Sequence, residues 1–361
     1  MLSHNLRHKS YVLRNKQLTK EEYEKEKPDI GSFKIQCECE AEFAHLRSGA
    51  VTRFASVTKS ENTTGDYITN SKNIYRSFGV DNAENIRYGS RATYIKDSMD
   101  VHGVGSSDGA VELLYEFING GYKDSRMFFS ANSYEGMLNA YYCDYCRGSE
   151  NVFGCVGLKK KQYCILNKQY LKEEYLELVS KIIEHMNKMP YVDASGIEYK
   201  YGEFFPSEIA PFTYNESLAQ EYFPIRQDVA ETAGYRWRKQ EEKSYRITIL
   251  SSALPDHIND TPDSILKEVI GCEHRAECSE QCTGAYKITP AELNFHRANG
   301  VALSRLCMNC RHSAQFKKRT PMQLWHRHCM KKGCPNEFET SYAPDRPEII
   351  YCESCYQQEV V

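Results

Sequence analysis

The chain has 361 residues, of which 41% are hydrophobic and 26% charged, and its formal net charge at pH 7 is −3. This balance excludes general disorder, and the length leaves room for roughly two or three domains. Neither the roughly 18 consecutive apolar residues of a membrane helix nor the apolar core of a secretion signal occurs, so we expect a cytoplasmic protein with no membrane partner.

The first 36 residues contain one copy of an internal repeat. Segment 6–23 (LRHKSYVLRNKQLTKEEY) is identical at ten of 18 positions to segment 158–175 (LKKKQYCILNKQYLKEEY), which lies 152 residues further along. Both copies predict a strand followed by a helix, and Thr19 and Glu22 have the spacing of a capping box. A duplicated unit of this kind indicates a stacked architecture, and we assign residues 1–36 to its first copy.

The chain then changes from a helical to a β-prone pattern. Residues 37–65 form a predicted helical connector, with apolar residues at helical spacing over 40–58. Residues 66–170 contain short β-prone runs such as IYRSFGV, MFFSA and YCILN, whose starts lie 11 to 16 residues apart. We interpret this interval as half a coil, which gives about 22 to 24 residues per coil of a parallel β-helix-like stack.

The alternative to this stack is an antiparallel sandwich built from the same short strands. The steady interval favours the stack, in which like residues form ladders in the interior. Because side chains alternate along a strand, Met127 and Phe129 should share one side, as should Val152 and Val156. The predicted fold class is therefore mainly β with flanking helices, a parallel β-helix-like stack plus the C-terminal tandem zinc ribbons predicted below.

An amphipathic helix is predicted over 171–190, where it should cap or flank the coils. Its apolar stripe contains Tyr175, Leu178, Val179, Ile182, Ile183, Met186 and Met189. Residues 191–262 form an aromatic-rich strap and mixed elements, and a capped helix is expected from Thr261 to Ile270. A peptide-binding groove is the alternative for the strap. The strap aromatics that we expect to be buried are Phe204, Phe205, Phe212 and Phe223.

The C-terminal segment 263–361 carries the most specific chemical signal. Eight cysteines form four close pairs: Cys278 with Cys282, Cys307 with Cys310, Cys329 with Cys334, and Cys352 with Cys355. Two such pairs supply the four tetrahedral thiolates that zinc prefers, and a chain with no secretion signal is expected to keep its thiols reduced. Since four protein ligands leave no open position, we predict tandem zinc ribbons that hold two structural zinc ions.

Other cysteines leave part of the ligand assignment open. Cys272 and His274 lie just upstream, and either can replace Cys278 or Cys282, although we expect both to be bystanders. The coil region holds four more thiols, which form either a third zinc site or an interior ladder. We favour the ladder, because free cysteine behaves as a small buried hydrophobe. These thiols belong to Cys143, Cys146, Cys155 and Cys164.

A concentrated basic segment surrounds the predicted zinc ligands. Residues 305–332 contain eight Lys or Arg and no Asp or Glu, although the chain as a whole is slightly acidic. Lys and Arg bind phosphates, and an interleaved aromatic residue offers base stacking. Basic residues that balance the zinc thiolates are the alternative, but they account for only part of the charge. The predicted nucleic-acid contacts are Arg311, Lys317, Lys318, Arg319, Trp325, Arg327, Lys331 and Lys332.

Several segments resemble an uncharacterised family of cysteine-rich proteins, which come mostly from genomes of environmental bacteria with reduced metabolism. They include NVFGCVGLKKKQYCILNKQY, YGEFFPSEIAPFTYNE, CTGAYKITPAELNFHR and CPNEFETSYAPDRPEIIYCESCYQQEVV. The resemblance covers nearly the whole chain and implies a cysteine-rich coil stack with tandem zinc ribbons. Typical members have further N-terminal ribbons and coils, so this chain resembles a shortened member. The family has no established activity to carry over.

The sequence contains no phosphate-binding G-x4-G-K-[ST] loop, no G-x-S-x-G elbow and no dinucleotide fingerprint. Carboxylate pairs in the coil region, Asp97 with Asp100 and Glu112 with Glu116, are the remaining hint of catalysis. We expect a non-catalytic zinc-ribbon scaffold that binds RNA or DNA through residues 305–332. The alternatives are a protein-assembly or phage-like structural component that binds other subunits, and a carbohydrate-binding or carbohydrate-active β-helix.

Overall fold

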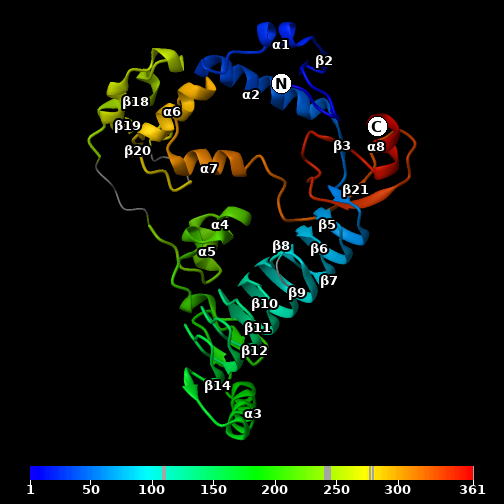
Figure 1. Ribbon diagram of the computed structural model, residues 1–361, viewed down its shortest axis with the longest axis vertical. Helices are drawn as coiled ribbons and strands as arrows, with labels where there is room; N and C mark the ends of the chain where they lie inside the picture. Colours follow the sequence, from blue (N-terminus) through cyan, green and yellow to red (C-terminus); the bar gives the residue numbers. More distant parts are fainter. Residues whose placement is uncertain (108–110, 240–244, 276–277, 279, 361) are drawn as a thin grey trace.

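The computed structural model describes residues 1–107, 111–239, 245–275, 278 and 280–360. Its central body is a parallel β-solenoid of about nine turns, with the helix α3 at one end and both chain termini near the other (Figure 1). Among the described residues, no helix combines the length and the apolar character needed to cross a bilayer. The predicted coil stack is confirmed, and the sandwich is excluded.

The solenoid strands stack almost in chain order, from β4 to β15, and β8 pairs with both β6 and β9. The pairs are parallel except for the last, β14 with β15. The strand bounds are β4 Val57–Thr58, β5 Glu61–Thr69, β6 Lys72–Asp81, β7 Glu84–Arg87, β8 Ser90–Thr93, β9 Ile95–Val104, β10 Val111–Gly120, β11 Ser125–Ala131, β12 Leu138–Tyr141, β13 Glu150–Phe153, β14 Gln162–Ile165 and β15 Lys168–Gln169.

One coil takes 12 residues through much of the stack, so the expected 22 to 24 residues per coil were wrong. Lys72 pairs with Glu84, and Glu84 pairs with Lys96, each one full turn further along the chain. A longer turn separates Lys96 from its partner Glu112. The sequence intervals therefore mark whole coils, because each coil is narrower than the wide β-helix that we assumed.

This narrow coil depends on a left-handed residue at about every third position. Along β6 and the following turn, the backbone φ is 56° at Asn73, 46° at Arg76, 65° at Gly79 and 51° at Asn82. Glycine and asparagine accept this conformation most readily, which explains their frequency in the coil region. The chain bends at each of these residues, and one side chain per three-residue side points inward.

A three-residue period therefore replaces the two-residue alternation that we expected. Met127 is buried inside the stack, whereas Phe129 packs on the outside, with its ring centroid 5.7 Å from that of Tyr201. Val152 is likewise buried, whereas Val156 is 58% exposed. Neither predicted pair shares a face of the coil.

Inward serines satisfy the backbone where the coil interior is narrow. The Ser130 hydroxyl donates to the carbonyl oxygen of Phe128 at 2.8 Å and accepts from the backbone N–H of Cys143 in the next coil at 3.0 Å. Ser133 makes the equivalent pair of bonds, to Ala131 and from Cys146. Buried backbone groups require partners, so these small polar residues belong to the core as much as the apolar ladders do.

The internal repeat is a hairpin followed by a helix. Its first copy comprises β1 (Val12–Leu13), β2 (Lys16–Gln17) and α1 (Lys20–Glu26), with the predicted capping box at Thr19. Its second copy comprises β14, β15 and α3 (Lys172–Lys188), and β14 and β15 pair in the same antiparallel way. The apolar stripe of α3 packs on the last coils through Tyr175 and its neighbours, as predicted, although Met189 at its end is exposed.

The helix predicted over 40–58 occurs earlier in the chain, as α2 (Phe33–Gly49). Ser32 caps its first turn by accepting from the backbone N–H of Ile35. The helix ends at Gly49 because the following residues form β3 (Val51–Arg53), which pairs in parallel with β23 near the C-terminus. Tertiary pairing with a distant strand therefore overrides the local helical pattern.

The strap and the following segment contain short elements, as predicted. They are β16 Tyr191–Val192, β17 Glu198–Tyr199, η1 Ser207–Ile209, η2 Tyr214–Glu216, α4 Leu218–Tyr222, α5 Gln227–Thr232, β18 Ile249–Leu250, η3 Ser251–Ala253, η4 Ile258–Asp260 and η5 Asp263–Lys267. Phe205 packs on Tyr142 of the solenoid. Phe212 and Phe223 are more than half exposed, so their predicted burial was wrong. The expected helix up to Ile270 ends at Lys267, where the chain turns into a strand.

The C-terminal part forms two cysteine-rich regions on either side of α2 (Figure 1). The first contains β19 Ile270–Gly271, β20 Ala285–Tyr286, α6 Pro290–Asn299 and α7 Met308–Phe316. The second contains β21 Trp325–His328, β22 Glu337–Thr340, β23 Ile349–Tyr351 and α8 Glu353–Val360. α7 and the chain after it connect the two regions.

Candidate metal centres

The first cysteine cluster lies between β19, β20 and the start of α7. The Sγ atoms of Cys272, Cys282, Cys307 and Cys310 all lie within 4.8 Å of one another, and all four residues are buried. The Sγ atoms of Cys272 and Cys310 are 3.9 Å apart, as are those of Cys282 and Cys307. With Zn–S bonds of about 2.3 Å, the edge of a regular ZnS4 tetrahedron is about 3.8 Å, so the cluster has the size of a zinc site.

The second cluster joins the C-terminus to the start of the solenoid. Its four Sγ atoms, from Cys329, Cys334, Cys352 and Cys355, also lie within 4.8 Å of one another. This quartet is the predicted one. Cys352 directly follows β23, which pairs with β3, and the end of the neighbouring β22 also contacts the solenoid. There Ser341 donates to the buried Asp66, and Thr340 donates to the carbonyl oxygen of Phe54 at 2.5 Å.

One thiol in each cluster is held ready to ionise. Burial opposes ionisation of Cys307, but the backbone N–H of Cys310 and the hydroxyl of Thr283 lower its pKa to about 6. Burial also opposes ionisation of Cys352, and the hydroxyl of Ser354 is the first of several donors that lower its pKa to about 6. Both residues immediately precede a helix, where backbone N–H groups favour a thiolate. Thiolates are the metal-ligating form, so each cluster is prepared for a cation.

The first cluster differs from the predicted ligand set at one position. Cys272, which we expected to be a bystander, takes the place we gave to Cys278. β19 pairs with β20 and thereby brings Cys272 beside Cys282, at a sequence spacing too long for a metal knuckle. Cys278 lies next to the cluster, with its Sγ 3.7 Å from that of Cys310. His274, Cys278 and Cys310 form a further set of ligand atoms within 4.8 Å.

The four coil-region thiols lie inside the solenoid, as the interior-ladder interpretation predicted. Their Sγ atoms face backbone carbonyl oxygens, as in the contact of 3.2 Å from Cys146 to the carbonyl of Cys155. Weak S–H donors of this kind fit a ladder of small buried residues. The thiols are those of Cys143, Cys146, Cys155 and Cys164.

The predicted basic surface is largely paired with acids from distant parts of the chain. Arg311 bonds to Glu292 at 2.8 Å, Lys317 bonds to Glu280 at 2.5 Å, and Lys331 bonds to Glu359. Each of these contacts offsets one positive charge. The segment is therefore much less cationic on the folded surface than its sequence indicates.

The remaining predicted contacts are divided between structural and exposed positions. Arg327 donates to the carbonyl oxygens of Tyr342 and Ala343, and Trp325 is half-buried in the β21–β22 hairpin. Lys318, Arg319 and Lys332 are exposed, although Lys318 lies 3.8 Å from Glu40 and Arg319 lies over the ring of Phe316. The structure does not bring the eight predicted residues together into one unpaired patch.

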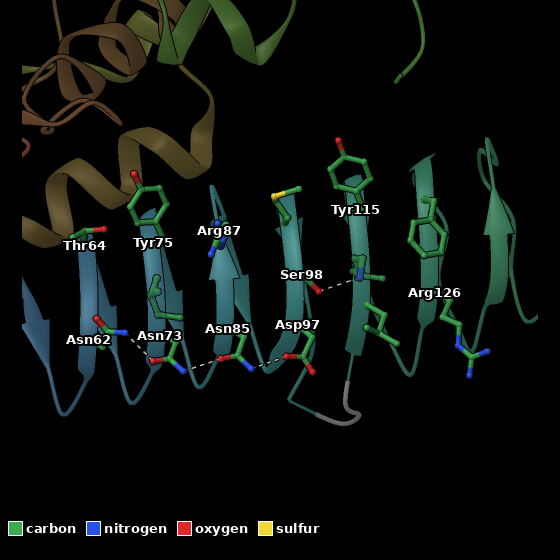
Figure 2. A pocket seen from close by; sticks show the side chains of 15 residues that line it. Asn62, Thr64, Asn73, Tyr75, Asn85, Arg87, Asp97, Ser98, Tyr115 and Arg126 are labelled. Atoms are coloured by element: carbon green, nitrogen blue, oxygen red, sulfur yellow. Dashed lines mark hydrogen bonds between the residues drawn. The ribbon is translucent and has the colours of Figure 1, made fainter. Parts of the chain in front are cut away.

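A long groove on the solenoid is a second candidate site (Figure 2). It has a volume of about 980 Å³, and one of its rims is a hydrogen-bonded ladder that connects Asn62, Asn73, Asn85 and Asp97 in series at 2.9, 2.9 and 2.6 Å. The opposite rim carries larger side chains, among them Tyr115 (Figure 2). Sequence reasoning missed this groove, since the ladder spacing becomes visible only with a 12-residue coil.

The groove lacks a carboxylate pair. Among the described residues that line it, Asp97 is the one with a carboxylate, and it accepts from Asn85. Asp100 and Glu116 occupy neighbouring coils outside this lining, and burial raises the pKa of both. The predicted acidic pairs therefore do not form a general acid and base within the groove.

The chain thus combines a β-solenoid with two buried four-cysteine clusters that can bind two metal ions. Comparison with protein-family models finds no match, and comparison with curated proteins finds none.

Proposed function

We propose that the protein is a non-catalytic scaffold in which two structural zinc ions hold the chain ends against a rigid solenoid. The observation that carries this proposal is the second cysteine cluster. It lies beside β23, which pairs with β3, while the preceding hairpin bonds to the first coil through Asp66. Four thiolates leave zinc no open position for water, which favours a structural role.

The absence of a carboxylate pair among the described groove-lining residues also favours a scaffold over a carbohydrate-active enzyme. Membership of the cysteine-rich family that the sequence resembles belongs to the same proposal. It is supported by the coarse combination of coil stack and paired cysteine clusters.

Zinc counting and protease sensitivity test the scaffold proposal. We expect the double variant Cys352→Ser, Cys355→Ser to lose one zinc ion per chain in native mass spectrometry. It should also become sensitive to limited proteolysis at the β3–β23 junction. The exposed Cys37 lies outside both clusters, so Cys37→Ser is the matched control and should retain every ion. A double variant with an unchanged zinc count would contradict the proposal.

Nucleic-acid binding is a second candidate, favoured by the three cations that remain exposed, Lys318, Arg319 and Lys332. Binding through phosphates must weaken as salt rises. Fluorescence anisotropy with a labelled single-stranded polynucleotide at low salt tests this candidate. Binding that is lost in the variant Lys318→Glu, Arg319→Glu supports it. No binding by the unaltered chain ends it and leaves the scaffold proposal intact.

A further inference from the structure

Six possible metal donors gather around the start of α7, two more than one tetrahedral zinc ion uses. Four of them form the first cluster, and the other two are His274 and Cys278. Both additional residues form a three-donor set with Cys310, which also belongs to the first cluster. The two sets therefore share one sulfur atom.

Cys278 is presented in the same way as the cysteines of the first cluster. Its Sγ lies 3.7 Å from that of Cys310, close to the edge of about 3.8 Å expected for two thiolates on one zinc ion. It also accepts from the backbone N–H two residues further along, at Glu280. Cys272 and Cys282 accept in the same manner from His274 and Gly284. This shared geometry indicates a ligand turn at Cys278.

Two polar atoms beside Cys278 are enclosed and have no hydrogen-bond partner. One is Nδ1 of His274, a member of the three-donor set, and the other is Oε2 of Glu280. The second oxygen of Glu280 bonds to Lys317 at 2.5 Å, and its carboxylate also contacts the Cys278 thiol. Enclosed polar atoms without partners are rare in folded proteins, and a metal ion would satisfy the imidazole nitrogen.

We propose that Cys310 bridges two zinc ions, one in the first cluster and one held by His274, Cys278 and Cys310. A thiolate sulfur has more than one lone pair and can bind two cations. The additional ion has three protein donors and therefore keeps a fourth position, as zinc sites that bind water or another small ligand do. Glu280 offers a carboxylate oxygen near that position. This inference rests on zinc binding by the first cluster, as proposed above.

The alternative is a single ion whose ligand alternates between Cys272 and Cys278. The two arrangements differ in stoichiometry, since the bridged pair raises the total from two ions per chain to three. They also differ in exchange. An ion with three protein donors should leave for a chelator at a concentration that leaves the four-thiolate ions bound.

Native mass spectrometry of the zinc-loaded full chain separates these possibilities. We expect three ions in the unaltered chain, two in His274→Ala and two in Cys278→Ser, whereas the control Cys37→Ser should keep three. Circular dichroism should show that the solenoid remains folded in each variant. Two ions in the unaltered chain, or an unchanged count in His274→Ala, would overturn the bridged pair.

The variant Cys307→Ser keeps this test separate from the scaffold proposal. Cys307 belongs to the first cluster but not to the additional set. If Cys307→Ser loses an ion and His274→Ala does not, the bridged pair is refuted while the first zinc centre stands. If neither variant loses an ion, zinc binding by the first cluster fails as well.

Discussion

Replacing Asp66 tests whether the second metal centre is fastened to the solenoid through one buried carboxylate. Its Oδ1 accepts from the backbone N–H groups of Ser56 at 2.8 Å and Tyr67 at 2.9 Å, and its Oδ2 accepts from the hydroxyl of Ser341. In Asp66→Ala both N–H groups lose this acceptor. At about 1–3 kcal/mol for each unsatisfied group, unfolding should become easier by about 2–6 kcal/mol.

Asp66→Asn is the matched control, because an amide oxygen still accepts from both N–H groups. A hydroxyl can act as donor or acceptor, so Ser341 can rotate to accept from the new amide nitrogen. We expect this variant to lose less than about 1.5 kcal/mol, the usual net value of one hydrogen bond. Urea unfolding of the zinc-loaded chain, followed by circular dichroism, measures both variants. Equal losses in the two variants, or a loss below about 1 kcal/mol in Asp66→Ala, would refute the reasoning.

Three further predictions concern the solenoid core and the metal centres. Ser130→Ala should cost about 1–3 kcal/mol in urea unfolding, because the backbone N–H of Cys143 is left buried without its acceptor; a change near zero would contradict this. Phe117→Ala should cost about 3–5 kcal/mol in the same assay, since Phe117 is fully buried between the coils. Acidification should release zinc into an indicator dye, because protons compete for the thiolates. Release should steepen below about pH 6, where Cys307 and Cys352 begin to take up protons; full retention at pH 5 would count against thiolate ligation.

The sequence predicts the stack but not the size of its coil, for a physical reason. Inward positions at a three-residue spacing include Ile68, Ser71, Ile74 and Ser77, which mix apolar and hydroxyl side chains. Because the serines bond to the backbone of a narrow interior, the hydrophobic pattern loses its period. A count of small and apolar residues together at every third position would have revealed the coil.

The first metal centre shows a similar limit. Pairs such as Cys307 and Cys310 are recognisable because one turn presents both thiols. Cys272 reaches the cluster only because β19 pairs with β20, a contact that spacing does not encode. The basic segment was misjudged for the same reason, since its partners Glu292 and Glu359 lie outside it in the chain.

The 12-residue coil makes the length of this protein adjustable in equal steps. Residues 84–95 form one turn, and the turns on both sides of it present the same backbone pattern. Removing that turn would bring α3 closer to the second zinc centre by one strand spacing of about 4.8 Å, with neither end altered. A chain built in this way can act as a molecular spacer, whose reach changes by insertion or deletion of single turns while its terminal chemistry stays constant.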